Sequence, residues 1–227
     1  MHDVSTHQRI NDILLGPLER PALKWLAGHM PPWVTPDIMT VIGVTGAFVI
    51  VTGYALSNAS RGFLWLASLG FVINWFGDSL DGTLARYRQI ERPKYGFFVD
   101  HILDAFCEVL IFLGLGLTPY VTFDNACICL IAYLLLSILV FVRTYVSGEF
   151  KISYSKLGPT ELRVIAISLN TFMFFFGKHT FSLGLGAARS LTVSVYDIPI
   201  AIITLLLVTF FVTTGLQHAR ELAKRGE

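Results

Sequence analysis

The chain has 227 residues, of which 54% are hydrophobic and only 15% are charged, and its formal net charge is +1. Its mean hydropathy of +0.63 excludes an ordinary soluble domain and is typical of an integral membrane protein. We therefore expect membrane lipids around the chain and no nucleic-acid partner. The three cysteines, Cys107, Cys127 and Cys129, lie in or beside apolar runs, which favours buried thiols over a disulfide or a metal site.

Residues 1–34 mix apolar and charged side chains and predict an amphipathic juxtamembrane segment. Pro17 and Pro21 should interrupt or kink a helix in this stretch. We therefore expect one or two short amphipathic helices at the cytoplasmic membrane interface. An ordinary soluble extension is the alternative.

Six apolar runs follow, each close to the length that a hydrocarbon core of about 30 Å requires. The first run begins after Thr35-Pro36-Asp37, where a hydroxyl can cap a helix and proline suits the first helical position. The expected spans are residues 38–56, 63–86, 95–117, 126–146, 158–176 and 198–214. The predicted fold is an all-α integral membrane protein with one six-helix domain over residues 35–220 and a cytoplasmic tail over residues 221–227.

Four carboxylates interrupt the second and third runs, where a charge at the membrane centre costs about 2.5–3.5 kcal/mol on insertion scales. Residues three or four apart share one face of a helix, so Asp78 and Asp81 form one patch and Asp100 and Asp104 form another. If the two helices are antiparallel neighbours, the four carboxylates converge. Glu108 continues the second stripe by one turn, with either a structural or a catalytic role.

Carboxylates this close repel one another, and a bound cation removes the conflict. Ligation by oxygen atoms alone favours a hard ion such as Mg²⁺, Mn²⁺ or Ca²⁺ over zinc. The small residues Gly82, Ala85 and Gly96 leave room for a ligand. Nearby positive charge fits a phosphate-bearing substrate, and it comes from Arg86, Arg88, Arg92 and Lys94.

The pattern D-x-x-D-G-x-x-A-R followed by G-x-x-x-D-x-x-x-D resembles the signature of the CDP-alcohol phosphotransferases, integral membrane enzymes of phospholipid synthesis. The matching positions are Asp78, Asp81, Gly82, Ala85, Arg86, Gly96, Asp100 and Asp104. The loop between Arg86 and Gly96 has one residue more than the family pattern, and insertions in loops are well tolerated. The segment Thr35 to Thr40 also resembles the start of the family's first span.

The resemblance implies that a hydroxyl attacks the β-phosphorus of a CDP-linked alcohol or lipid and expels CMP. It implies two Mg²⁺ or Mn²⁺ ions bound by Asp78, Asp81, Asp100 and Asp104, with Asp104 also the catalytic general base. The implied CDP-binding residues are Gly82, Ala85, Arg86 and Gly96. It further implies a homodimer.

A second basic set consists of Arg143, Lys156 and Arg163. These residues are interpreted either as a pocket for an anionic acceptor or lipid head group, or as positive charge facing the cytoplasm. Asp100-His101 resembles the choline and ethanolamine phosphotransferases, but the sequence does not choose the alcohol, the CDP donor or the direction of transfer.

Lysine and arginine positions predict the orientation. If both termini share one side of the membrane, only Arg61, Lys178 and Arg189 of the 17 Lys and Arg residues lie on the other side. The positive-inside rule then places both termini and the acidic cluster at the cytoplasmic face.

Three alternatives remain at the level of sequence. Intramembrane acids also mark the ion pathways of cation transporters and channels. A catalytically silent lipid-binding homologue would carry the same motif. The acids could also be buried ion pairs with neighbouring arginines. The crowding of the acids at the ends of two adjacent spans, with no inverted repeat, favours the phosphotransferase.

Overall fold

The computed structural model describes residues 14–147, 158–184 and 190–225, and these residues are nearly all helical. The elements are α1 (Gly16–His29), α2 (Pro36–Leu56), α3 (Phe63–Tyr87), α4 (Pro93–Gly116), α5 (Phe123–Ser147), α6 (Pro159–Phe176), β1 (Thr180–Gly184), β2 (Ser190–Ser194) and α7 (Asp197–Arg225). Six of the helices match the six predicted runs. The last helix continues to Arg225, well beyond the predicted end of its run at residue 214.

Within the part of the chain that the structure describes, four helices are long and apolar enough to cross a membrane: α2, α3, α5 and α7. The integral membrane class is therefore confirmed. Both remaining helices in the predicted set carry ionisable side chains that lower their hydropathy, with Asp100, Asp104 and Glu108 on α4 and Glu161 and Arg163 on α6. Six spans stay a prediction.

Helices α2 and α3 approach each other unusually closely because glycines face glycines. A Cβ atom on Gly77 would lie 2.1 Å from the backbone nitrogen of Gly43, and one on Gly46 would lie 2.4 Å from the backbone nitrogen of Asn74. Small residues allow this approach in membrane helix pairs, where close packing replaces the hydrophobic driving force of water. The pair forms the rigid base of the fold.

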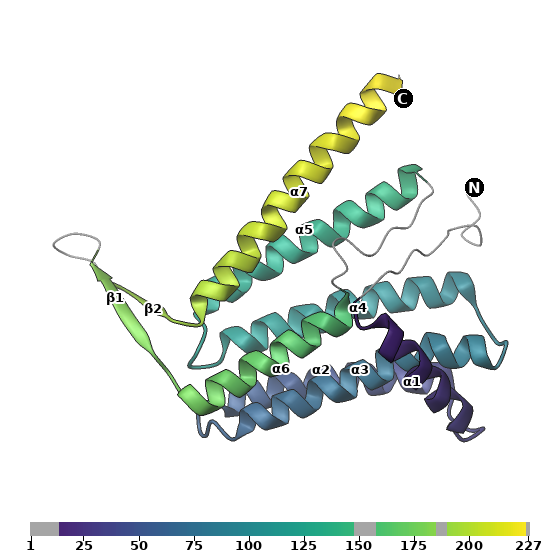
Figure 1. Ribbon diagram of the computed structural model, residues 1–227, viewed down its shortest axis with the longest axis horizontal. Coiled ribbons are helices and arrows are strands. Elements are labelled where there is room, and N and C mark those ends of the chain that lie inside the picture. Colours follow the sequence, from purple (N-terminus) through teal and green to yellow (C-terminus); the bar gives the residue numbers. More distant parts are fainter. Residues whose placement is uncertain (1–13, 148–157, 185–189, 226–227) are drawn as a thin grey trace.

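The other helices are arranged around this pair (Figure 1). Helix α3 also packs on α1 and α6, whereas α4 packs on α2 and α5, and α5 packs on α7. In Figure 1, α5 and α7 lie side by side and lean away from α2, α3 and α6. The ends of α3, α5 and α7 and the start of α4 lie toward one side of the molecule, and the β1–β2 hairpin projects from the other.

Two buried hydrogen bonds connect α2, α3 and α6 away from the acidic residues. The hydroxyl of Tyr54 donates to Oδ1 of Asn170 at 3.0 Å, and Nδ2 of Asn170 donates to the hydroxyl of Ser68 at 3.2 Å. All three residues are buried among apolar neighbours. Such partners satisfy one another where water is excluded, and they fix the register of the three helices.

The N-terminal stretch forms a single helix within the described residues, where one or two short helices, interrupted or kinked by two prolines, were expected. Pro17 stands in the first turn, where its missing N–H has no helical acceptor in any case, and Pro21 is accommodated inside the helix. Leu23 and Ala27 are buried against a cluster that includes Leu80 of α3. Placement of α1 at the membrane interface stays a prediction.

The all-α prediction is corrected by a two-stranded antiparallel sheet between α6 and α7. Phe181 of β1 pairs with Val193 of β2. The sequence alternates apolar and polar residues on both sides of the turn, a strand signal that is short beside the neighbouring apolar runs. Asp197 ties the hairpin to the bundle, because its carboxylate accepts hydrogen bonds from the backbone N–H groups of Ser194 (2.9 Å) and Thr122 (2.8 Å).

We expect the substitution Gly77→Ala to destabilise the protein by about 1–3 kcal/mol or more, because the new methyl group overlaps the α2 backbone. The matched control is Gly96→Ala, since a Cβ there has no neighbour within 4 Å. Alanine also favours helix over glycine, so the control should keep or slightly raise the thermal unfolding midpoint in detergent. Equal midpoints for the two variants would contradict the close packing of α2 and α3.

Candidate active site

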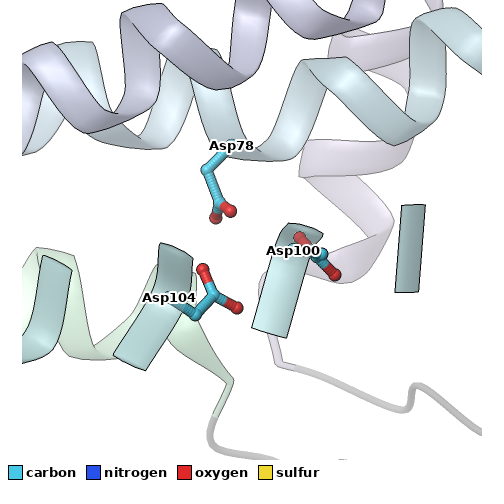
Figure 2. A group of neighbouring side chains, drawn as sticks. All are labelled: Asp78, Asp100 and Asp104. Carbon is cyan, nitrogen blue, oxygen red and sulfur yellow. The ribbon is translucent and has the colours of Figure 1, made fainter. Parts of the chain in front are cut away.

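Three of the predicted acids form one cluster between α3 and α4. Asp78 of α3 and Asp100 and Asp104 of α4 each contribute a carboxylate oxygen, and these oxygens all lie within 4.8 Å of one another. Figure 2 shows Asp78 on α3 pointing toward Asp104 on α4. Asp100 lies one turn away from Asp104 on the same helix. All three are half-buried.

The cluster has room around it because α3 and α4 both rest on α2 and bracket a hollow. The empty volume is about 260 Å³, including the part that is open to the surroundings. Its lining consists of Thr40, Gly43, Val44, Asn74, Asp78, Asp81, Asp100, Leu103, Asp104 and Cys107. Gly43 allows the α2 backbone itself to form part of the wall.

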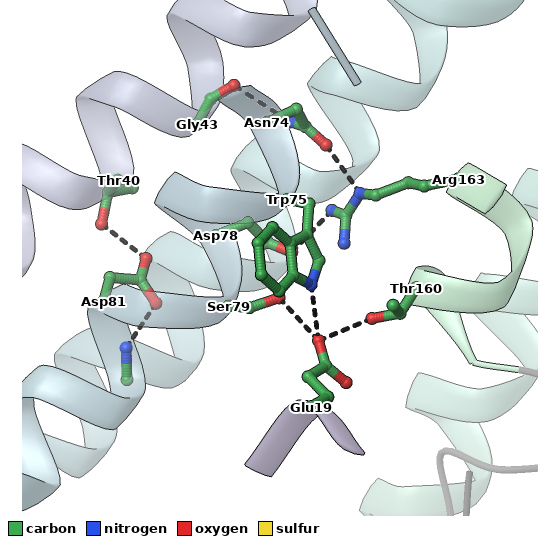
Figure 3. Close-up of polar contacts among 11 residues, drawn as sticks. Glu19, Thr40, Gly43, Asn74, Trp75, Asp78, Ser79, Asp81, Thr160 and Arg163 are labelled. Atoms are coloured by element: carbon green, nitrogen blue, oxygen red, sulfur yellow. Dashed lines mark hydrogen bonds and ion pairs between the residues drawn. The ribbon is translucent and has the colours of Figure 1, made fainter. Parts of the chain in front are cut away.

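The fourth acid, Asp81, lines the same hollow but turns toward α2. The hydroxyl of Thr40 donates to Oδ2 of Asp81 at 2.7 Å, and the backbone N–H of Gly82 donates to Oδ1 at 2.5 Å (Figure 3). Asp81 is not one of the three acids whose oxygens lie within 4.8 Å. In the described structure it therefore faces the hollow from the α2 side.

Arg163 of α6 lies directly against the acidic cluster. Its Nη2 donates to Oδ2 of Asp78 at 2.6 Å, and its Nε donates to Oδ1 of Asn74 at 2.9 Å (Figure 3). Nδ2 of Asn74 in turn donates to the backbone carbonyl of Gly43 at 2.9 Å. Arg163, which was predicted to line an acceptor pocket, thus forms an ion pair with Asp78, which was predicted to bind metal.

Arg143 is half-buried on α5. Lys156 lies outside the described residues.

The residues expected to bind CDP lie at the end of α3 and the start of α4, and none of them lines the hollow. A Cβ on Gly82 would lie 3.2 Å from Nη1 of Arg86, so the guanidinium of Arg86 lies along the bare side of Gly82. Nη2 of Arg86 donates to the hydroxyl of Thr83 at 3.2 Å. Ala85 is half-buried, and Gly96 is exposed.

Two of the loop arginines have structural partners. Arg88 donates to the backbone carbonyls of Met30 (3.0 Å), Pro31 (2.8 Å) and Val34 (2.5 Å). Arg92 forms an ion pair with Asp37 at 2.5 Å. Arg88 holds the segment before α2, and Arg92 holds the first turn of α2, against the connection between α3 and α4, which favours a structural role for these side chains.

Sequence reasoning did not predict the two uncharged hydrogen-bonding side chains at the hollow that contact its charged residues, Thr40 and Asn74. Thr40 belongs to the Thr35 to Thr40 segment that carries part of the resemblance, and Asn74 lies four residues before Asp78, on the same helix face. The helical spacing could have indicated Asn74. Glu108 lies one turn beyond Asp104 on α4 and is half-buried.

The residues present fit a hard divalent cation. Carboxylate and hydroxyl oxygens are the donors that Mg²⁺ and Mn²⁺ prefer, and the described side chains at the hollow offer no histidine. Three carboxylates whose oxygens lie within 4.8 Å of one another also repel each other, and a bound cation would relieve that repulsion.

Comparison with known proteins matches this site to a family. A sequence model of the CDP-alcohol phosphatidyltransferases matches residues 33–213. The chain belongs to the CDP-alcohol phosphatidyltransferase family. The match includes both halves of the acidic motif and every helix from α2 to α6, and it ends within α7. The resemblance drawn from the sequence is therefore confirmed.

Curated relatives carry two kinds of name. Over 84 residues the chain is 38% identical to the phosphatidylinositol phosphate synthase of Cutibacterium acnes, which covers 37% of this chain and 38% of the relative. It is 28% identical over 164 residues to cholinephosphotransferase 1 of Gallus gallus, covering 66% of this chain and 47% of the relative. The corresponding protein of Danio rerio is 26% identical over 159 residues, or 65% of this chain and 40% of the relative. The chain thus spans less than half the length of each of these relatives.

We expect Arg163→Gln to bind Mn²⁺ at least about threefold more tightly than the unsubstituted chain, because a positive charge beside Asp78 opposes a second cation. The loss of the free Mn²⁺ signal in electron paramagnetic resonance measures this affinity. Arg61→Gln is the control, since this substitution removes the same charge just before the start of α3, where Arg61 lies over the ring of Phe174. Equal affinities for the two variants would show that Arg163 does not neutralise the cluster.

Proposed function

We propose that the chain is a CDP-alcohol phosphotransferase of phospholipid synthesis. An alcohol hydroxyl attacks the β-phosphorus of a CDP-linked alcohol or lipid, a new P–O bond forms, and the P–O bond to CMP breaks. The observation that carries the proposal is the cluster of Asp78, Asp100 and Asp104 at a hollow within the residues that match the family.

In this proposal, Asp78, Asp81, Asp100 and Asp104 hold two Mg²⁺ or Mn²⁺ ions. Bound divalent cations supply charge neutralisation for the pyrophosphate and for the departing nucleotide. The support from the geometry is strongest for Asp78, Asp100 and Asp104, whose oxygens approach one another. Asp81 contributes from the α2 side, where the hydroxyl of Thr40 orients its carboxylate.

Asp104 is the proposed general base. A carboxylate at this position accepts the proton of the incoming hydroxyl as the new P–O bond forms. Asp104 lines the hollow together with the apolar Leu103 and with the three other acids. Leu103 and Val44 exclude water from that side, which favours attack by an alcohol over hydrolysis.

The CDP group is proposed to bind along the end of α3 and the start of α4. Gly82 and Gly96 expose backbone that a phosphate or ribose can approach, and Arg86 supplies an exposed guanidinium beside Gly82. Ala85 completes this surface as a small residue on α3.

The acceptor or head group is proposed to meet Arg143, Lys156 and Arg163. Arg163 is the best supported of the three because it already lies against Asp78. The names of the relatives differ in the product, and so the alcohol, the CDP donor and the direction of transfer are left open.

We also propose six spans, with both termini and the acids at the cytoplasmic face. In support, the ends of α3, α5 and α7 and the start of α4 lie toward one side in Figure 1. Exposed apolar side chains on and beside α1, among them Leu14, Leu18 and Trp25, suit a membrane interface. The homodimer implied by the resemblance stays a prediction that light scattering of the detergent-solubilised protein can test.

We expect purified protein with Mn²⁺, a CDP-alcohol or CDP-lipid and a panel of alcohols to release CMP. Asp104→Asn should lower the rate of CMP release by about 10²–10⁴-fold, because the base is lost while the shape of the side chain is kept. Asp124→Asn, which changes an exposed acid in the first turn of α5, is the matched control and should keep full activity.

Retained turnover in Asp104→Asn, with an unchanged unfolding midpoint, would remove Asp104 from the base role. Absence of CMP release across the whole panel, together with cation flux in proteoliposomes, would replace the phosphotransferase with a transporter. Absence of both activities with retained lipid binding would indicate a silent homologue.

A further inference from the structure

A single carboxylate oxygen on α1 joins three helices beside the acidic cluster. Oε1 of Glu19 accepts hydrogen bonds from Nε1 of Trp75 (2.7 Å), from the hydroxyl of Ser79 (3.3 Å) and from the hydroxyl of Thr160 (2.7 Å). Figure 3 shows Glu19 reaching these three side chains. Trp75 and Ser79 belong to α3, and Thr160 belongs to the first turn of α6.

The partners of Glu19 are direct neighbours of the residues that hold Arg163. Trp75 follows Asn74 and Ser79 follows Asp78, whereas Thr160 lies one helical turn before Arg163. Two polar bridges therefore connect α6 to α3 at successive turns. One is the Arg163 contact with Asn74 and Asp78, and the other passes through Glu19.

A second contact ties α1 to the start of α6. The backbone N–H of Leu15 donates to Oε1 of Glu161 at 2.7 Å, and the backbone N–H of Gly158 donates to Oε2 of the same carboxylate at 2.8 Å. Glu161 is buried. The first turn of α6 is thus connected to α1 both through Thr160 and through Glu161.

The α1 helix lies before residue 33, where the match to the family begins. The glycines of the described α3 that meet another helix closely, Gly70 and Gly77, meet α2 and not α6. The contacts described here between the first turn of α6 and α3 are polar, and a satisfied hydrogen-bonded network of this kind selects one arrangement.

We propose that Glu19 is a positioning residue that sets the place of Arg163 at the acidic cluster. It holds the first turn of α6 against α3, so that the guanidinium of Arg163 meets Asp78 and Asn74. The consequence for turnover rests on the proposed function, whereas the placement of α6 does not.

The first test is a kinetic double-mutant cycle. Glu19→Ala should lower kcat/KM for the alcohol acceptor by about ten- to a hundredfold, as expected when a site residue shifts by about 1 Å. Glu19→Gln should stay close to the unsubstituted protein, since its carbonyl oxygen can accept the same hydrogen bonds from the same neutral donors. Lys24→Ala, at an exposed position of α1, is the matched control.

The energetic coupling between Glu19 and Arg163 distinguishes a positioning role of Glu19 from a general loss of stability. In an Arg163→Gln background, Glu19→Ala should cause little further loss, because the residue through which it acts is already removed. Losses that multiply in the double variant would overturn the proposal. So would a loss in Glu19→Gln as large as that in Glu19→Ala.

A second measurement does not depend on activity. Hydrogen–deuterium exchange of the cation-free protein should be faster in peptides covering residues 158–165 for Glu19→Ala, and unchanged for Glu19→Gln and Lys24→Ala. If the unsubstituted protein releases no CMP, the proposed function fails and this exchange alone decides the inference. Unchanged exchange in Glu19→Ala would overturn it.

Discussion

Negative charge gathered inside a helical membrane bundle is the constraint on which this structure depends. Asp78, Asp100 and Asp104 bring oxygens within 4.8 Å of one another, and carboxylates at such distances need compensation in a medium of low dielectric constant. Arg163 provides one positive charge, at 2.6 Å from Asp78. The mutual repulsion of the three acids favours the binding of a cation, and the hollow that they line is partly open to the surroundings. The proposed binding of cations by these acids follows from that repulsion.

The hollow itself follows from unequal helix spacing. Glycines at positions 43, 46 and 77 let α2 and α3 touch through their backbones, whereas α4 rests on α2 and keeps its acids across a gap from α3. Helix α6, which carries Arg163, packs on α3. The start of α6 is joined to α1 by the contact of Thr160 with Glu19 and by the contact of Glu161 with the backbone of Leu15. The closely packed α2 and α3 give the site rigidity, and the wider separation of α3 from α4 leaves the hollow between them.

Much of the helical framework could be predicted from the sequence because its signals are local. Thr35-Pro36 and Gly158-Pro159 mark the starts of α2 and α6, and apolar length predicts the spans. The hairpin between α6 and α7 was missed because its strands are only five residues each, too short to stand out beside neighbouring apolar helices.

Tertiary contacts set the details that spacing could not supply. Asp81 shares a helix face with Asp78, yet a hydroxyl from Thr40 on another helix turns its carboxylate aside. Arg163 was predicted either to line an acceptor pocket or to face the cytoplasm. No local pattern indicates that it meets Asp78, and none links Glu19 to Thr160. These contacts join residues more than 40 positions apart in the sequence, so single-sequence periodicity contains no information on them.

Anomalous X-ray diffraction from crystals grown with Mn²⁺ tests the binding of cations by the α3 and α4 acids most directly. We expect the strongest anomalous peak to lie in contact with the carboxylates of Asp78, Asp100 and Asp104, with Arg163 moved away from Oδ2 of Asp78. A peak at another position, or an unchanged ion pair between Arg163 and Asp78 with no peak at saturating Mn²⁺, would contradict a metal-dependent site at this cluster.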